Sequence, residues 1–377
     1  YTKSQTVHVL DASRSVTVVE KLLGSKKQDY IQEVVTEYTR VRENHAKKRS
    51  EKRLVSYEQA VENKLKIEWK QEDCPKPNFI GNKLYKNFPL EDIIPFIDWT
   101  PFFQTWQLAG KFPRILEDEI VGEQATSLYQ DALEMLNKIS SRKWLTANAV
   151  IGIWRANSNG KDDIITYQNE ERTEEKAKFY HLRQQTQKAK GLPNFSLADF
   201  IAPKDSKVED YIGGFVVTAG LGIEKYIQEF EEKEDDYNSI LLKALADRLA
   251  EAFAELMHKK VREEIWGYAK SENLNKEELI KEKFQGIRPA PGYPACPDHT
   301  EKVTLFEQLD AENKIGVKLT DSLAMYPAAS VSGFYFAHPK SKYFGIGKIQ
   351  KDQVQDIAQR KQIEIEKMER WLSSSVL

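Results

Sequence analysis

The stretch RPAPGYPACPDHTEK, residues 288–302, combines residue types that could bind a small polar molecule. Arg288 carries a planar guanidinium group that matches the geometry of a carboxylate. Four prolines keep the backbone extended and leave carbonyl oxygens without helical or ladder partners, and Gly292 lets a ligand approach the main chain. The predicted ligand has a carboxylate and hydrogen-bond donors, as an amino acid or its nucleoside conjugate does. The alternative interpretation is a rigid structural crossing.

A second candidate residue is Asp98, which lies among closely spaced aromatic residues in FIDWTPFFQTW. A carboxylate in such surroundings lies at the rim of an apolar pocket or pairs with a cation, because burying a bare charge is costly. Alternatively, Asp98 or Thr100 caps a helix that has Pro101 in its first turn.

Other catalytic patterns are absent or incomplete. Gly220 and Gly222 in VVTAGLGIE lack the third glycine of a dinucleotide-binding turn, and FGIGK is too short for a phosphate-binding loop. Cys296 and His299 form a lone C-x-x-H, which supplies at most half of a zinc site. No serine hydrolase, kinase or papain-type signature occurs. The residues therefore indicate no catalytic group and no metal site.

Composition limits the classes of partner. The 377 residues carry a net charge of -2, which gives no whole-chain electrostatic argument for nucleic acid or an anionic membrane. A local basic run could touch phosphate but is typical of a solvated helix end: Lys47, Lys48, Arg49, Lys52 and Arg53. The two cysteines are too few for a disulfide framework, and no run of about 18 apolar residues could span a bilayer. We expect a reducing, cytoplasmic location.

The pattern of apolar residues predicts an α+β fold with an antiparallel sheet and flanking helices. Strands are expected at 148–156 and 162–168 around an NSNGK turn, at 210–220, and in SLAMYP, SGFYFAH and SKYFGIGKI. Helices are expected at 29–49, 125–139, 239–268, from about 300, and at 351–372. Strands that neighbour one another and helices that come in blocks favour this class over regular strand-helix alternation.

The first residues predict a strand-helix unit without a sheet to join. Residues 6–10 suit a buried strand, and residues 16–23 continue as a helix that ends at Gly24. We expect this unit to be the last piece of an α/β domain, and the chain to be a fragment of something longer. Two prolines in CPKPNFIG make residues 50–80 the expected linker.

Three segments resemble the activation domain of cobalamin-dependent methionine synthases: IRPAPGYPACPDHTEK, FIDWTPFFQTWQLAGKFPRIL and SKYFGIGKIQKDQVQDIAQRK. The likeness extends to the long helix in DDYNSILLKALADRLAEAFAELMHKKVREEIWGYA. The resemblance implies a C-shaped α+β domain with a bent antiparallel sheet over residues 56–377. Residues 1–55 would be the C-terminal remnant of the preceding cobalamin-binding domain and a linker helix.

The same resemblance implies a reactivation module that binds S-adenosylmethionine in a shallow groove. S-adenosylmethionine would supply its methyl group to reduced cobalamin on the neighbouring domain of the same polypeptide. A flavoprotein, either flavodoxin or a diflavin reductase, would donate the electron. The cobalamin-binding motif D-x-H-x-x-G is absent from the chain, so the fragment should bind S-adenosylmethionine without holding cobalamin or turning over alone.

The family's site residues carry over to matching positions. Asp98 would contact the amino group or the sulfonium side of the ligand, and Arg288 would hold its carboxylate. Glu251 matches a position near the ligand or the corrin, although it could equally be a solvated helix carboxylate. No catalytic base is implied, because displacement at a sulfonium needs positioning alone.

The remaining implied contacts come from two loops. Ala290, Gly292 and Tyr293 would supply main-chain contacts, and Tyr343 and Phe344 would line the pocket. Aromatic rings can attract a sulfonium through cation-π interaction. Two alternatives remain at this point: a scaffold that docks a reductase without binding a small molecule, and an independent methyltransferase.

Overall fold

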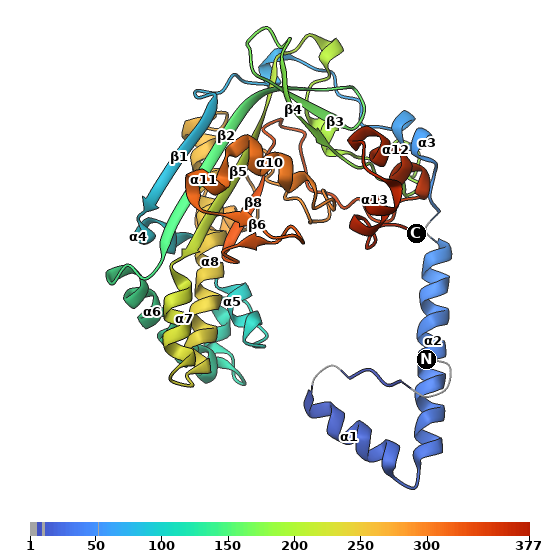
Figure 1. The fold of residues 1–377 in the computed structure, drawn as a ribbon, viewed down its shortest axis with the longest axis vertical. Helices are drawn as coiled ribbons and strands as arrows, with labels where there is room; N and C mark the ends of the chain where they lie inside the picture. Colours follow the sequence, from blue (N-terminus) through green and yellow to red (C-terminus); the bar gives the residue numbers. More distant parts are fainter. Residues whose placement is uncertain (1–5, 10–11, 52) are drawn as a thin grey trace. The chain divides into compact units, whose positions relative to one another are not determined.

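The computed structural model describes residues 6–9, 12–51 and 53–377 and divides the chain into two compact units, Tyr1–Val55 and Ser56–Leu377 (Figure 1). The first unit contains α1 (Ala12–Leu23) and α2 (Lys27–Glu51), which confirm the predicted helices.

The predicted strand over residues 6–10 is wrong for residues 6–9, which form no strand, and Leu10 lies outside the described residues. A strand needs a hydrogen-bonded neighbour, and the described part of this unit offers none. Instead, the N–H of His8 donates to the Tyr38 hydroxyl on α2 (2.8 Å). Val34 of α2 is buried, whereas Val41 is exposed.

The basic run falls at the end of the first unit. The side chains of Lys47, Lys48 and Arg49, and the whole of Lys52, lie outside the described residues. Arg53 is exposed. A contact between this run and phosphate therefore stays a prediction.

The second unit is an α+β domain. Its strands are β1 (Gly81–Phe88), β2 (Thr146–Ser158), β3 (Asp163–Tyr167), β4 (Glu175–Tyr180), β5 (Asp210–Leu221), β6 (Lys318–Leu319), β7 (Met325–Tyr326) and β8 (Ser330–Tyr335). Its helices are α3 (Tyr57–Glu62), α4 (Leu90–Ile93), α5 (Thr100–Thr105), α6 (Gly122–Ser141), α7 (Ile223–Glu231), α8 (Asp236–Lys260), α9 (Lys276–Ile280), α10 (Glu301–Leu309), α11 (Ala311–Ile315), α12 (Lys351–Lys361) and α13 (Ile365–Trp371).

A six-stranded antiparallel sheet forms the centre of this unit, in the order β4-β3-β2-β5-β8, with β1 also paired to β2 (Figure 1). Along one edge, β2 pairs first with β1 and then with β3, while β5 covers its other edge. The hairpin predicted around NSNGK is β2-β3. These observations confirm the predicted fold class.

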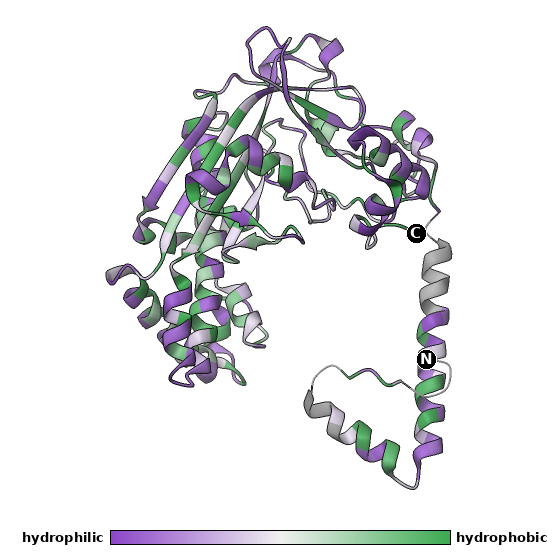
Figure 2. Ribbon diagram, in the orientation of Figure 1, coloured by the Kyte–Doolittle hydropathy of each residue, from purple (hydrophilic) through white to green (hydrophobic). Residues whose placement is uncertain are grey.

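Both faces of the sheet are buried. Ile151 and Ile153 of β2 pack into the core that contains α6 and α8, whereas Val150 and Trp154 pack into the core that contains α10 and α11. Successive side chains of a strand point to opposite faces, so the two sets separate. Figure 2 shows hydrophobic residues along β2, β5 and α8. Burial on both faces explains why the sequence of β2 reads as one apolar run.

The indole of Trp154 fits because two glycines lie beside it. A Cβ added to Gly152 would lie 2.1 Å from this ring, and one added to Gly214 would lie 2.7 Å from it. The indole N–H donates to Asn82 Oδ1 (3.0 Å). The glycines inside these strands therefore make room for a large side chain.

The sequence predicts a linker at residues 50–80. Its residues from Ser56 onward belong to the second unit, so the prediction is wrong for them. The N–H of Tyr57 donates to Asp352 Oδ2 on α12 (2.7 Å), and Cys74 is buried. Pro75 and Pro77 interrupt regular structure near the end of this segment, but the residues before them form α3 and contact distant side chains.

Two predictions near the C-terminus need correction. Residues 341–349 form no strand, because the N–H of Ile346 donates to the carbonyl of Pro294 in a loop (2.8 Å). The helix predicted at 351–372 is interrupted between α12 and α13, where Gln362 has a φ of 55°. That left-handed conformation ends α12.

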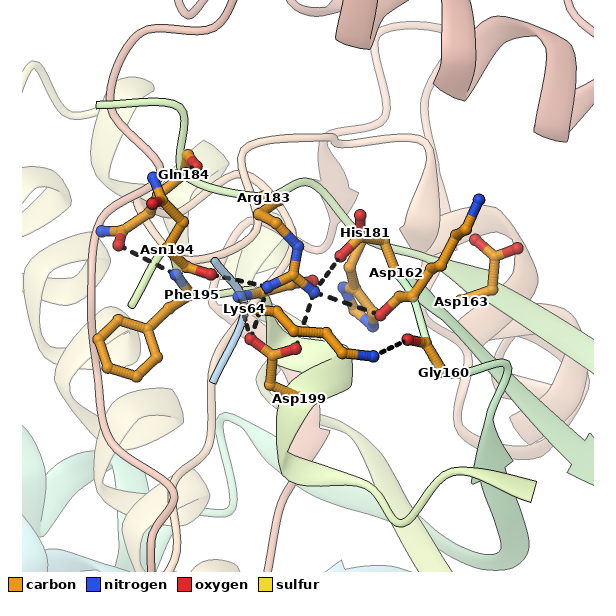
Figure 3. Close-up of polar contacts among 12 residues, drawn as sticks. Lys64, Gly160, Asp162, Asp163, His181, Arg183, Gln184, Asn194, Phe195 and Asp199 are labelled. Atoms are coloured by element: carbon orange, nitrogen blue, oxygen red, sulfur yellow. Dashed lines mark hydrogen bonds and ion pairs between the residues drawn. The ribbon is translucent and has the colours of Figure 1, made fainter. Parts of the chain in front are cut away.

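A buried ion cluster supports the β3-β4 side of the domain (Figure 3). The Arg183 guanidinium pairs with Asp162 and Asp199, each at 2.7 Å. His181 lies beside the cluster, and neither of its ring nitrogens has a hydrogen-bond partner within the described residues. Burial lowers the pKa of His181 to about 3, although Asp162 opposes this shift. The folded domain therefore keeps this imidazole neutral.

His181 should make the domain less stable in mild acid. Its folded pKa is about 3, below the unfolded value of about 6.5. The unfolded chain binds more protons between these values, so the free energy of unfolding falls as the pH drops through that window. Relative to wild type, His181→Gln should lessen the loss between pH 7.5 and pH 5 by about 2 kcal/mol.

Urea unfolding at the two pH values measures this difference, with the exposed His8→Gln as the control variant. An equal loss of stability in His181→Gln and in wild type would contradict the assignment of the acid effect to His181.

Candidate functional site

An open cavity of about 260 Å³ lies beside α8 in the second unit. Arg248, Glu251, Ala252 and Glu255 form one of its walls. Their spacing repeats every three or four residues, so they share one face of the helix. α8 is held there because its opposite, apolar side packs on the sheet.

The other walls come from segments far apart in the sequence. They are Phe96, Asp98 and Pro101 before and in α5, Leu279, Ile280 and Glu282 in and after α9, and Arg288. The cavity therefore brings together Asp98, Glu251 and Arg288, which the sequence proposed as site residues from separate motifs.

Asp98 has a local role in addition to its place at the cavity. Its side chain is half-buried, and Oδ1 accepts a hydrogen bond from the Thr100 N–H (3.0 Å). Thr100 is the first residue of α5, and its hydroxyl accepts from the Phe112 N–H (3.3 Å). Asp98 thus fixes the turn into α5 while its second carboxylate oxygen makes no hydrogen bond within the described residues.

Glu251 is half-buried on the cavity wall. Burial, together with the Glu251 carboxylate, raises the pKa of Tyr293.

The proline-rich loop is attached to the sheet through its backbone. Ile287 exchanges two hydrogen bonds with Phe336 (both 3.0 Å), and the carbonyl of Pro289 accepts from the Phe334 N–H (2.9 Å). The carbonyl of Pro294 accepts from the Ile346 N–H (2.8 Å). The expectation that proline carbonyls lack ladder partners is therefore wrong for Pro289, which accepts from a residue of β8, whereas the partner of Pro294 lies in a loop. Pro289 lies beside an N–H group of β8 that needs an acceptor, whereas Pro294 lies in the turn between Tyr293 and Cys296.

The tip of the loop is a tight turn. The carbonyl of Ala290 accepts from the Tyr293 N–H (3.2 Å), and the Gly292 N–H donates to the Cys296 carbonyl (2.7 Å). Gly292 has a φ of 96°, and a Cβ added there would lie 2.3 Å from the His299 ring. The close neighbour at Gly292 in this structure is therefore His299. Tyr293 is 60% exposed.

The two aromatic residues predicted in SKYFG lie in different environments. The Tyr343 hydroxyl accepts from the Arg288 N–H (3.0 Å), and its side chain is partly exposed. Phe344 is partly buried and packs against Phe195 and Phe200 (ring centroids 5.6 and 6.2 Å). The structure brings Tyr343 to Arg288 but packs the partly buried Phe344 against the core.

The Arg288 side chain reaches across to α8. Its Nη1 donates to Glu255 Oε2 (2.6 Å) and lies 3.4 Å from His258 Nδ1. Burial opposes the charge on Arg288, but Glu255, together with Tyr343 and Tyr335, outweighs this effect, so the pKa of Arg288 is raised above its ordinary value. Nε and Nη2 make no hydrogen bond to any residue of the described part of the chain.

Sequence reasoning missed Arg248, Glu255 and Glu282, which also line the cavity. A signal for two of them exists. Arg248, Glu251 and Glu255 interrupt the apolar pattern of α8 on a single face, at helical spacing. On a helix that is largely buried, a polar stripe of this kind indicates a cavity or an interface. Glu282 follows the short α9 and has no such signal.

Other features of the chain contribute no residue to this cavity. A cavity of about 750 Å³ in the first unit, lined by residues such as His8, Val34 and Tyr38, contains none of the predicted site residues. Cys74 and Cys296 are free and buried. Within the described ranges, no cluster of three His, Cys, Asp or Glu side chains could hold a metal ion. No described helix is long and apolar enough to cross a membrane.

Gly292→Ala should destabilise the second unit by about 1–3 kcal/mol, because its left-handed backbone disfavours a Cβ and the His299 ring resists it. Gly160→Ala is a matched control, because Gly160 also has a positive φ (79°) but nothing within 4 Å of an added Cβ. Urea unfolding should show the larger loss for Gly292→Ala. Equal losses in the two variants would exclude the His299 contact.

Comparison with known proteins identifies a family and a similar solved structure. Residues 89–362 match the family described as vitamin B12 dependent methionine synthase, activation domain. Among solved structures, the crystal structure of the MetH reactivation domain bound to AdoHcy is 52% identical in sequence, with a TM-score of 0.83. The match covers 86% of this chain and 98% of that chain. The chain therefore belongs to the activation-domain family of vitamin B12 dependent methionine synthases, as the sequence motifs predicted.

Proposed function

We propose that the second unit binds S-adenosylmethionine at the cavity beside α8 and presents its methyl group to reduced cobalamin on a neighbouring domain of the same polypeptide. A flavoprotein, flavodoxin or a diflavin reductase, is the proposed electron donor. The observation that carries this proposal is the uncommitted Nε and Nη2 edge of Arg288 at a cavity rich in carboxylates.

The free edge of Arg288 suits the carboxylate of an amino acid. Nε–H and Nη2–H can donate two parallel hydrogen bonds to one carboxylate. The third nitrogen is already engaged by Glu255. The similar MetH reactivation domain was crystallised with AdoHcy, which carries the same amino acid group as S-adenosylmethionine.

The charge of the cavity suits a cationic ligand. Its lining includes the carboxylates of Asp98, Glu251, Glu255 and Glu282 but only two arginines, Arg248 and Arg288. S-adenosylmethionine carries an ammonium and a sulfonium against one carboxylate, so its net charge is positive. Opposite charges favour each other most where water is partly excluded.

The size of the cavity suits part of this ligand. Its volume of about 260 Å³ lies below the range of roughly 300–1,000 Å³ that is usual for drug-sized ligands. We propose that the amino acid portion occupies the cavity. The nucleoside would then lie over Ala290, Gly292 and Tyr293, where Gly292 and Tyr293 are exposed.

The proposed reaction asks little of this chain's side chains. Reduced cobalamin, when it is bound to its own domain, supplies the nucleophile. The leaving thioether is neutral, so no residue of this chain has to donate or accept a proton. Arg288 and the carboxylates have to orient the sulfonium toward the open side of the cavity, and such positioning is a recognised source of rate enhancement.

The first unit is proposed to be the end of the cobalamin-binding domain with a linker helix. Exposed apolar side chains on both of its helices support this proposal: Val19, Leu23 and Val41. Such residues are expected to pack against more of a domain than these two helices provide.

Arg288→Ala should weaken the binding of S-adenosylmethionine by about 1.5–3 kcal/mol, because it removes a charged hydrogen-bonding partner. Arg288→Lys should also bind less tightly than wild type, because an ammonium lacks the two-pronged edge. Isothermal titration calorimetry measures both, with the exposed Arg142→Ala as control. If the folded wild-type chain binds no S-adenosylmethionine, the proposal is rejected. The alternative of a scaffold that docks a reductase without binding a small molecule would then be favoured. An unchanged affinity in Arg288→Ala would remove Arg288 from the site.

Asp98→Asn should reduce the preference for S-adenosylmethionine over S-adenosylhomocysteine about two- to fivefold, as expected for a partly exposed charge. The methylated ligand carries one more positive charge, so it loses more when a carboxylate is neutralised. Asparagine keeps an oxygen that can accept from the Thr100 N–H. Titration with both ligands measures the ratio, and the exposed Asp92→Asn serves as control. A ratio unchanged in Asp98→Asn would contradict the electrostatic argument.

A further inference from the structure

The Arg288 guanidinium is held from one side by two residues of α8. Glu255 and His258 lie about one turn apart and therefore share a face of the helix. Glu255 Oε2 accepts from Nη1 of Arg288 at 2.6 Å, and His258 Nδ1 lies 3.4 Å from the same nitrogen. Both contacts converge on Nη1 and leave the opposite edge of the guanidinium uncommitted.

In the part of the chain that the structure describes, Glu255 and His258 make no other hydrogen bond through their second polar side-chain atoms. Glu255 Oε1 and His258 Nε2 are buried and form no hydrogen bond within the described residues. The His258 ring stacks on Tyr335 (centroids 5.2 Å) and meets Phe284 edge-on (4.8 Å). Burial and two neighbouring guanidinium groups lower the pKa of His258 well below its ordinary value. The ring is therefore neutral, and Nδ1 can accept from Arg288.

Glu255 also has an energetic reason to stay paired with Arg288. Their side chains are only 15% and 19% exposed, so each charge would be poorly solvated without the other. An arginine without such a partner samples many rotamers, and a ligand that binds it has to restrict them. The ion pair imposes this restriction before a ligand arrives.

We infer that Glu255 and His258 are positioning residues, which present the Nε and Nη2 edge of Arg288 to the carboxylate of the ligand. They act through Arg288 and thereby favour ligands that carry a carboxylate over analogues that lack it. This inference rests on the proposed binding of S-adenosylmethionine at Arg288.

A double-mutant cycle tests the inference in the whole chain. The variants are Glu255→Gln, Arg288→Ala and their combination, with Glu264→Gln as a matched control. Glu264 is 59% exposed and pairs with Lys260 one turn before it. Titrations use S-adenosylmethionine and its decarboxylated analogue, and thermal unfolding verifies that each variant is folded.

Glu255→Gln should weaken the binding of S-adenosylmethionine about five- to tenfold, as expected when a charged hydrogen-bonding partner is neutralised. The decarboxylated analogue in Glu255→Gln, and S-adenosylmethionine when Glu255→Gln is added to Arg288→Ala, should lose only the roughly twofold expected from one neutralised, partly screened carboxylate near a cation. Equal losses for both ligands, or the same loss with and without Arg288, would overturn the inference, since a merely structural role predicts those results.

A measurement without ligand separates this inference from the proposed function. In nuclear magnetic resonance spectra of arginine-labelled protein, rotation about the Cζ–Nε bond of Arg288 should be slow in wild type and faster in Glu255→Gln. His258→Leu should accelerate it in the same direction. If wild type binds no S-adenosylmethionine, the proposed function fails, and this rotation still decides the positioning role. Rotation that is equally fast in wild type and Glu255→Gln would refute it.

Discussion

The site depends on the backbone pairing between the proline-rich loop and β8. Hydrogen bonds of Ile287 and Pro289 extend the sheet by a short stretch, and Arg288 lies between these two anchored residues. Because α8 packs against the same sheet, the loop and the helix share one support. The separation between Arg288 and Glu255 is therefore set by sheet geometry and core packing, and no flexible connection intervenes.

Two groups of charged residues lie in different parts of this sheet's surroundings and differ in exposure. The core around α8 borders the cavity, whereas the buried cluster around Arg183 stabilises the opposite end of the sheet, where β3 and β4 meet α12. Arg183 pairs with two carboxylates and Arg288 with one, and of these two arginines Arg288 has an edge beside a cavity that is unpaired within the described residues. Arg183 has two carboxylate partners and is fully buried, which leaves it no capacity for a ligand.

Much of this arrangement could be predicted from local sequence. The β2-β3 hairpin, α6, α8 and the role of Asp98 beside a cavity follow from periodicity, turn residues and motif resemblance. The environments of other residues depend on tertiary contacts, which local sequence does not specify. Tyr343 and Phe344 are adjacent in sequence, but only tertiary packing determines that Phe344 turns toward Phe195 and Phe200. Glu255 looks like any carboxylate of a long charged helix until the loop places Arg288 opposite. Residues beyond Ser56 resemble a linker because their contacts are with distant side chains, as Tyr57 illustrates.

The walls of the cavity have a further consequence for folding. Asp98, Glu251, Glu282 and Arg288 reach the cavity from segments that meet only when the sheet and its helices are assembled. A ligand bound there can interact with the folded unit but not with any isolated segment. Its binding free energy therefore adds to the stability of the unit as a whole, in proportion to the logarithm of ligand concentration above saturation. Occupancy and global folding are thermodynamically linked in this domain.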